Sequence, residues 1–305
     1  MKLYKMFDPI FLIENSITGL FSGGIYALIG LGVVFIFRAT KVFNFAHGAV
    51  MMFGAYFYLT FSEILISFGS PNWLIFLISL PLTFTASALL GMIIEKFLMR
   101  PMMGQHPFPL IMITIGLISV LEGAAAMIWT PAAQYPKPLF PLNIDFIGSL
   151  AINRQMLFSF ILAIIIFLII SILFVRSRSG VAIRATATDQ STAALMGINV
   201  SGVFSLSWII ACVTGSLAGI LLAPLNSLTP TLGIVGLSVI SVVILGGLDS
   251  IIGVLIAAFI IGWVESMASH FFGGQYKEIV PYIIVLLIII IKPHGLMGTR
   301  QIDRL

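Results

Sequence analysis

The sequence predicts an all-α fold: a polytopic bundle of about nine transmembrane helices, between eight and ten, in one membrane domain over residues 1–305. Hydrophobic residues make up 60% of the chain and charged residues 9%, whereas soluble domains have roughly 45–50% and about 25%. The apolar residues form repeated runs of about 20, which is the length that crosses the hydrocarbon as a helix. The ten-residue alternation of outer-membrane barrels is missing from the sequence. A soluble globular protein is therefore excluded.

The expected spans lie between polar, glycine-containing or proline-containing interruptions. Two of the nine are shorter than the others. They cover residues 17–37, 49–68, 73–94, 109–129, 156–175, 203–223, 233–247, 251–270 and 279–292.

Basic residues predict the orientation of these spans. If residues 176–200 are cytoplasmic, nine spans place every other basic loop on the same side, as the positive-inside rule requires, whereas eight would place one of them outside. The residues concerned are Arg38, Lys41, Lys96, Arg100, Lys292, His294, Arg300 and Arg304. The sequence therefore predicts a multi-pass protein of the inner (plasma) membrane with its N-terminus outside and its C-terminus in the cytoplasm.

Residues 176–200 form the one long polar segment between apolar blocks. Their middle is rich in Ala, Thr and Ser, which predicts a short helix, and Gly197 stands where such a helix would end. The segment is expected to dock on another protein. An ordinary amphipathic helix at the membrane interface is the alternative.

Two polar breaks interrupt the apolar pattern, at residues 43–48 and 224–233. By the expected topology they enter from opposite faces, which is typical of inverted-repeat transporters with discontinuous helices. Irregular backbone at membrane depth usually lines a cavity. The residues predicted to line a substrate pathway are Asn44, His47, Gly48, Thr229 and Gly233. The glycines of the first span are expected to let helices pack closely, which is the default explanation for them.

Glu122 and Glu265 are the acidic residues expected deep inside spans. A charge at such a depth is costly and usually faces a cavity or a partner, so both are candidates for the substrate pathway. Protonated, hydrogen-bonded structural roles are equally compatible with the sequence.

The sequence predicts no catalytic residue, no metal and no cofactor. Cys212, the only cysteine, lies in an apolar run, and the four histidines lack metal-ligand spacing, so a structural role is expected for His47. The chain has no phosphate loop, no zinc-protease motif and no nucleophile arrangement. It is therefore not expected to be an enzyme or to hydrolyse ATP itself.

The proline-rich stretch within residues 131–155 is expected outside the membrane as a stiff, extended connection. It would suit an extracytoplasmic partner, and a simple connector explains it equally well.

Three motifs together resemble the permeases of branched-chain amino acid ABC transporters of the LivH type. They are VFNFAHG at 42–48 after a glycine-rich span, the polar segment 179–200, and the late run 242–266 followed by KPHGLMG at 292–298. The resemblance extends over residues 17–298. It implies a substrate-importing membrane subunit that works by alternating access, with branched-chain amino acids as the expected substrates.

The resemblance also implies the partners: a second, LivM-like permease, two cytoplasmic ATPase subunits that bind the ATP, a periplasmic or lipid-anchored substrate-binding protein, and membrane lipid. Nucleic acid is not among them. In the family, the central cytoplasmic segment docks on the ATPase. The matching positions here are Gly180, Arg184, Ala187, Asp189, Ala193, Leu195 and Gly197. Arg184 and Asp189 would orient the segment by charge, and Leu195 with Met196 would anchor it.

The sequence is compatible with three other functions. Members of the same family also import urea or short amides. An ion-coupled secondary transporter would fit the suspected inverted repeat and the two intramembrane glutamates. A membrane enzyme would need Glu122, His47 and Asp249 to converge from different spans.

Overall fold

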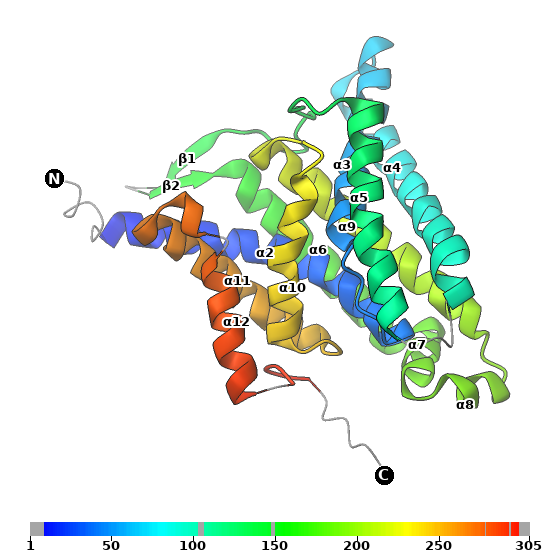
Figure 1. Cartoon of the computed structure of the whole chain (residues 1–305). Helices are drawn as coiled ribbons and strands as arrows, with labels where there is room; N and C mark the ends of the chain where they lie inside the picture. Colours follow the sequence, from blue (N-terminus) through cyan, green and yellow to red (C-terminus); the bar gives the residue numbers. More distant parts are fainter. Residues whose placement is uncertain (1–8, 103–106, 148–149, 278, 293, 299–305) are drawn as a thin grey trace. The chain divides into compact units, whose positions relative to one another are not determined.

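The computed structural model describes residues 9–102, 107–147, 150–277, 279–292 and 294–298 (Figure 1). Within these residues, eight helices are long and apolar enough to cross a membrane, and residues Leu232–Gly246 form a shorter apolar helix. The expected all-α bundle with about nine spans is confirmed. The helices are α2 (Pro9–Thr40), α3 (His47–Ser67), α4 (Asn72–Ile94), α5 (Pro107–Trp129), α6 (Arg154–Arg176), α7 (Arg178–Thr188), α8 (Gln190–Leu195), α9 (Val200–Asn226), α10 (Val235–Gly246), α11 (Ile251–Phe272) and α12 (Ile279–Ile291).

Short elements complete the chain. A π-turn, η1 (Glu95–Met99), and a 3-10 turn, η2 (Arg100–Met102), extend α4, while η3 (Leu232–Ile234) precedes α10 and η4 (Gly274–Tyr276) precedes α12. The strands β1 (Ile144–Ile147) and β2 (Leu150–Asn153) pair antiparallel. This hairpin lies in the loop that the sequence predicts to be extended, and Arg154 secures it with hydrogen bonds of 2.7 and 2.6 Å to the carboxylate of Asp145.

The chain divides into two compact units, so α2, α6 and α10 each contribute to both. The first unit contains residues up to Gly30, residues 140–167 and residues from Ser238 onward, and the second contains residues 31–139 and 168–237. In the first unit, α2 and α11 approach closely at small residues, since a Cβ atom on Gly19 would lie 2.8 Å from the carbonyl oxygen of Gly262. The packing explanation therefore holds for this glycine of the first span.

In the second unit, α3 is the central helix and packs against α4, α5 and α9 (Figure 1). A Cβ atom on Gly54 of α3 would lie 2.4 Å from the Cα atom of Ser216 in α9, and one on Gly91 of α4 would lie 2.7 Å from the sulfur of Cys212. Small residues thus let these helices approach almost backbone to backbone. Cys212 is fully buried, as expected for a core residue.

The spans agree with the expected ranges except at two ends. Within the described residues, α2 reaches back to Pro9 rather than to near residue 17, because Glu14 and Asn15 have partners: Glu14 accepts a hydrogen bond from the backbone N–H of Ala151, and Asn15 donates to the carbonyl of Phe11. The third span continues through η1 and η2 to Met102. A polar residue in an apolar run predicts the end of a membrane helix only if it has no hydrogen-bond partner in the fold.

Candidate coupling segment and substrate pathway

The polar segment after α6 folds as two helices, α7 and α8, rather than one. Ser177 caps α7 by accepting a hydrogen bond of 3.0 Å from the N–H of Gly180. Gly180 is buried against the end of α6, where a Cβ atom would lie 1.8 Å from the carbonyl oxygen of Phe174. Because no side chain fits in that space, glycine at this position sets the sharp turn from α6 into α7.

Arg184 fastens α7 to the last turn of α6. Its Nη1 donates to the carbonyl of Phe174 at 2.5 Å and its Nη2 to that of Val175 at 3.3 Å. These carbonyls lie at a helix C-terminus, where a cation is favoured. The guanidinium lies 5.1 Å from the centre of the Phe174 ring, and that of Arg38 lies 5.0 Å from the same ring. Arg184 therefore attaches α7 to the end of α6, and its positive charge interacts with the carbonyl groups there.

Asp189 separates the two helices. Its backbone is extended, which ends α7, and its side chain caps α8 by accepting hydrogen bonds from the backbone and hydroxyl groups of Ser191 and Thr192 at 2.6–3.2 Å. These bonds stabilise the carboxylate and lower the pKa of Asp189 to about 2. Asp189, like Arg184, shapes the segment from within.

The capping by Asp189 predicts an acid-sensitive helix α8. Because the pKa of Asp189 is below its ordinary value of 3.8, its contribution is complete above about pH 4 and is lost as the pH falls toward 2. Hydrogen exchange at the amides of Ser191 and Thr192, corrected for the intrinsic rate, is expected to lose protection over that range. In Asp189→Asn, which still caps, protection should not change between pH 4 and 2. An identical acid transition in both proteins would contradict this assignment.

Helix α8 ends in a left-handed turn at Gly197, which has φ +83°. The N–H groups of Gly197 and Ile198 donate to the carbonyls of Ala194 and Ala193 at 3.0 Å each, which is the Schellman pattern. Gly197 therefore ends the helix as the sequence predicts.

The two large apolar side chains at the end of α8 face outward. Leu195 is 88% exposed and Met196 is 80% exposed, while Ala193 is buried and Ala187 is half-buried. Leu195 and Met196 are thus the members of the segment best placed to contact a partner.

The first polar break holds His47 inside the second unit. Asn44 fixes the turn before α3, since its side-chain oxygen accepts a hydrogen bond of 3.0 Å from the N–H of Ala46. His47 is 2% exposed, and its ring lies between α2 and α9, where a Cβ atom on Gly32 would be 2.7 Å from Nε2 and one on Gly215 would be 3.3 Å away. Across the described ranges, no three His, Cys, Asp or Glu residues could hold a metal ion together.

The two polar breaks touch each other at glycines. A Cβ atom on Gly48 would lie 2.2 Å from the carbonyl oxygen of Gly233 and 2.8 Å from the Cα atom of Gly236. Thr229 is half-buried in the second break and shares a hydrogen bond of 3.0 Å with Thr231. The structure thus brings Gly48 and Gly233 together, with the N-termini of α3 and α10 at the contact. The inverted repeat itself stays a prediction.

The two candidate glutamates belong to different units. Glu265, in α11, is 1% exposed and accepts a hydrogen bond of 2.7 Å from the hydroxyl of Tyr26 in α2. This bond connects two helices of the first unit, which is what a structural role of Glu265 would require. Glu122 is half-buried in α5 of the second unit.

Sequence reasoning missed a buried acid at the end of the third span. Glu95 is 1% exposed and accepts hydrogen bonds of 3.0 and 2.7 Å from Arg100 and of 2.9 Å from Ser205 in α9. The π-turn η1 places Arg100 within reach of Glu95 five residues earlier. The basic residues Lys96 and Arg100 suggested a solvated loop. An acidic residue beside them, Glu95, was the signal in the sequence that could have indicated an ion pair with Arg100.

The long apolar helices of the described residues make this chain a multi-pass membrane protein. Residues 15–289 match the family model described as the branched-chain amino acid transport system / permease component, and the chain belongs to this family.

Named relatives match over nearly the full length. The high-affinity branched-chain amino acid transport system permease protein BraD of Pseudomonas aeruginosa is 25% identical over 96% of this chain and 97% of its own. The corresponding permease LivH of Escherichia coli K12 is 25% identical over 97% and 98%. A LivH permease of Methanocaldococcus jannaschii is 29% identical over 91% and 90%. An inward-facing structure assigned to the metal-chelate type of ABC transporter covers 90% of this chain and 82% of its own, with 19% identity and a TM-score of 0.42.

Proposed function

We propose that this chain is the permease subunit of an ATP-binding-cassette importer for amino acids, with the branched-chain amino acids as the preferred substrates. The names of its relatives supply the substrate class. The observation that carries the proposal is the α7–α8 segment, in which Leu195 and Met196 are exposed while Gly180 and Arg184 hold α7 on the end of α6. A segment fixed at one end and apolar at the other can transmit motion from a partner into the membrane helices.

In this proposal, two ATPase subunits bind on the side of α7 and α8, and a substrate-binding protein binds on the opposite side. A second permease completes the complex in the membrane. ATP binds to the ATPase subunits, since the sequence of this chain has no phosphate loop. With α8 in the cytoplasm, the N-terminus is outside and the C-terminus is inside, in accordance with the basic loops.

The mechanism is alternating access driven from α8. Closure of the ATPase subunits moves Leu195 and Met196, and Arg184 passes the motion to the end of α6. The contact of Gly48 with Gly233 and Gly236 holds the two breaks together. Opening the path past Asn44 and His47 then requires the two breaks to separate. Most of the choice of substrate is left to the binding protein.

Reconstitution with the partner subunits tests this function. Proteoliposomes that contain the assembled complex, with ATP inside and binding protein plus radiolabelled leucine outside, are expected to accumulate leucine only with hydrolysable ATP. Uptake by this chain without ATPase subunits, driven by an ion gradient, would overturn the proposal.

A further inference from the structure

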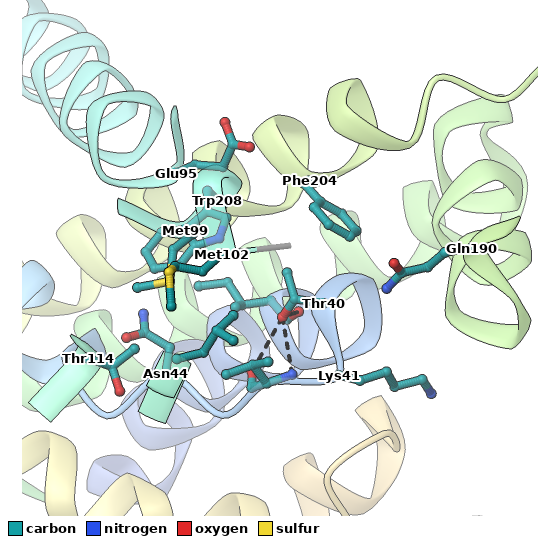
Figure 2. Close-up of a pocket in the computed structure, with 13 residues that line it drawn as sticks. Thr40, Lys41, Asn44, Glu95, Met99, Met102, Thr114, Gln190, Phe204 and Trp208 are labelled. Atoms are coloured by element: carbon teal, nitrogen blue, oxygen red, sulfur yellow. Dashed lines mark hydrogen bonds between the residues drawn. The ribbon is translucent and has the colours of Figure 1, made fainter. Parts of the chain in front are cut away.

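The second unit contains a cavity of about 200 Å³ beside the first polar break. By that measure a water molecule needs roughly 10–15 Å³, so the cavity is large enough for a small organic molecule. Its walls come from the end of α2 and the break that follows it, from η1, η2, α5 and α9, and from the first residue of α8 (Figure 2). The apolar part of the wall is formed by Ile36, Val42, Met99, Met102, Leu110 and Phe204.

Two buried N–H donors belong to this wall and lack hydrogen-bond partners. Asn44 is 2% exposed, and because its oxygen is bonded to the N–H of Ala46, its amide Nδ2 is oriented as the free end. Trp208 is 1% exposed, and its indole Nε1, which can only donate, has no acceptor. Buried donors are rarely left unsatisfied, so these two groups indicate an acceptor that occupies the cavity.

The acceptor that fits is a carboxylate. Lys41 is exposed and adds positive charge at the edge of the cavity. The acidic group in the wall, Glu95, is bonded to Arg100 and Ser205, so its charge is already matched. Met99 and Met102 also line the cavity (Figure 2), and their flexible side chains can move aside for a ligand. The remaining wall is suited to an aliphatic side chain.

We propose that this cavity binds an aliphatic amino acid from the cytoplasm, through its carboxylate and its side chain, and that occupancy inhibits further uptake. The inference rests on the proposed function, which gives the side of the membrane and the substrate class. Gln190, the first residue of α8, forms part of the wall. A ligand lodged between Gln190, Phe204 and the end of α2 therefore resists the motion of α8 that the ATPase subunits drive.

The test uses the assembled complex in proteoliposomes with L-leucine enclosed at increasing concentrations. Uptake with no enclosed leucine measures the proposed function, and its fall with enclosed leucine measures the inference, so the two can fail separately. Trp208→Phe removes the indole donor and is expected to raise the inhibitory concentration about 10- to 100-fold, as for a lost hydrogen bond to a charged group. The matched control is Trp129→Phe, whose indole N–H donates to Thr60 at 2.6 Å away from the cavity wall.

A second comparison needs no variant. Enclosed 4-methylpentanoate, which keeps the carboxylate, is expected to inhibit, while isopentylamine, which lacks it, is not. Saturable inhibition by leucine that is weakened in Trp208→Phe and unchanged in Trp129→Phe supports the site. Absence of saturable inhibition, equal inhibition in both variants, or equal inhibition by the acid and the amine would overturn it.

Discussion

Gly48→Ala is expected to lower the uptake rate at least tenfold and to destabilise the protein by about 1–3 kcal/mol, as overpacking of a tight contact does. The added methyl group would lie 2.2 Å from the carbonyl oxygen of Gly233 and 2.8 Å from the Cα atom of Gly236, so backbone rather than a flexible side chain must move. The methyl group would therefore keep the two polar breaks apart at the point where Gly48 normally contacts Gly233 and Gly236. ATP-driven uptake and thermal unfolding of the purified complex measure the two effects.

Gly116→Ala is the matched control for that substitution. Gly116 also lies in a membrane helix, α5, and a Cβ atom there would have no neighbour within 4 Å. Since alanine favours a helix over glycine by up to about 1 kcal/mol, this variant should be as stable as the parent or slightly more so. If Gly48→Ala behaved like Gly116→Ala, the close contact between the breaks would not be part of the working structure.

Leu195→Asp is expected to abolish coupled transport while leaving membrane insertion intact. The side chain is 88% exposed at the end of α8, so a charge there costs the free permease little. In a complex it would be buried on the partner, and if Leu195 is one of the few residues that dominate the interface, its loss costs 2 kcal/mol or more, or about 30-fold in affinity. ATPase subunits retained on the purified permease, and hydrolysis stimulated by binding protein, are the quantities to measure.

Leu195→Met serves as the control, since it keeps an apolar side chain of similar volume. It should retain the ATPase subunits and the stimulated hydrolysis. Normal coupling in Leu195→Asp would show that the exposed end of α8 is not a contact with the ATPase.

The sequence was sufficient for the spans because each is a long apolar run that only a helix can place in lipid. It was also sufficient for the end of α8, since Gly197 adopts the φ of +83° that other residues avoid. The split of the coupling segment at Asp189 could have been read from this acid itself, since Asp is a favoured N-cap residue and its side chain accepts hydrogen bonds from Ser191 and Thr192.

Contacts between distant segments could not be read from the sequence. The role of Arg184 depends on where the last carbonyls of α6 lie, and that position is set by the close approach at Gly180. The buried pair of Glu95 and Arg100 depends on the π-turn that brings them together. The cavity beside Asn44 is assembled from the first break and six separate helical elements, and no single segment carries its pattern.

Cross-linking from Leu195 shows directly whether α8 contacts an ATPase subunit in the assembled complex. The one native cysteine, Cys212, is buried, so Leu195→Cys supplies a single accessible thiol for a maleimide photo-cross-linker in the assembled complex. If α8 couples this permease to an ATPase, we expect a cross-link to the ATPase subunit whose yield changes when ATP is added. An active complex that gives no such cross-link, or a thiol that reacts with an impermeant reagent from outside the cell, would contradict it.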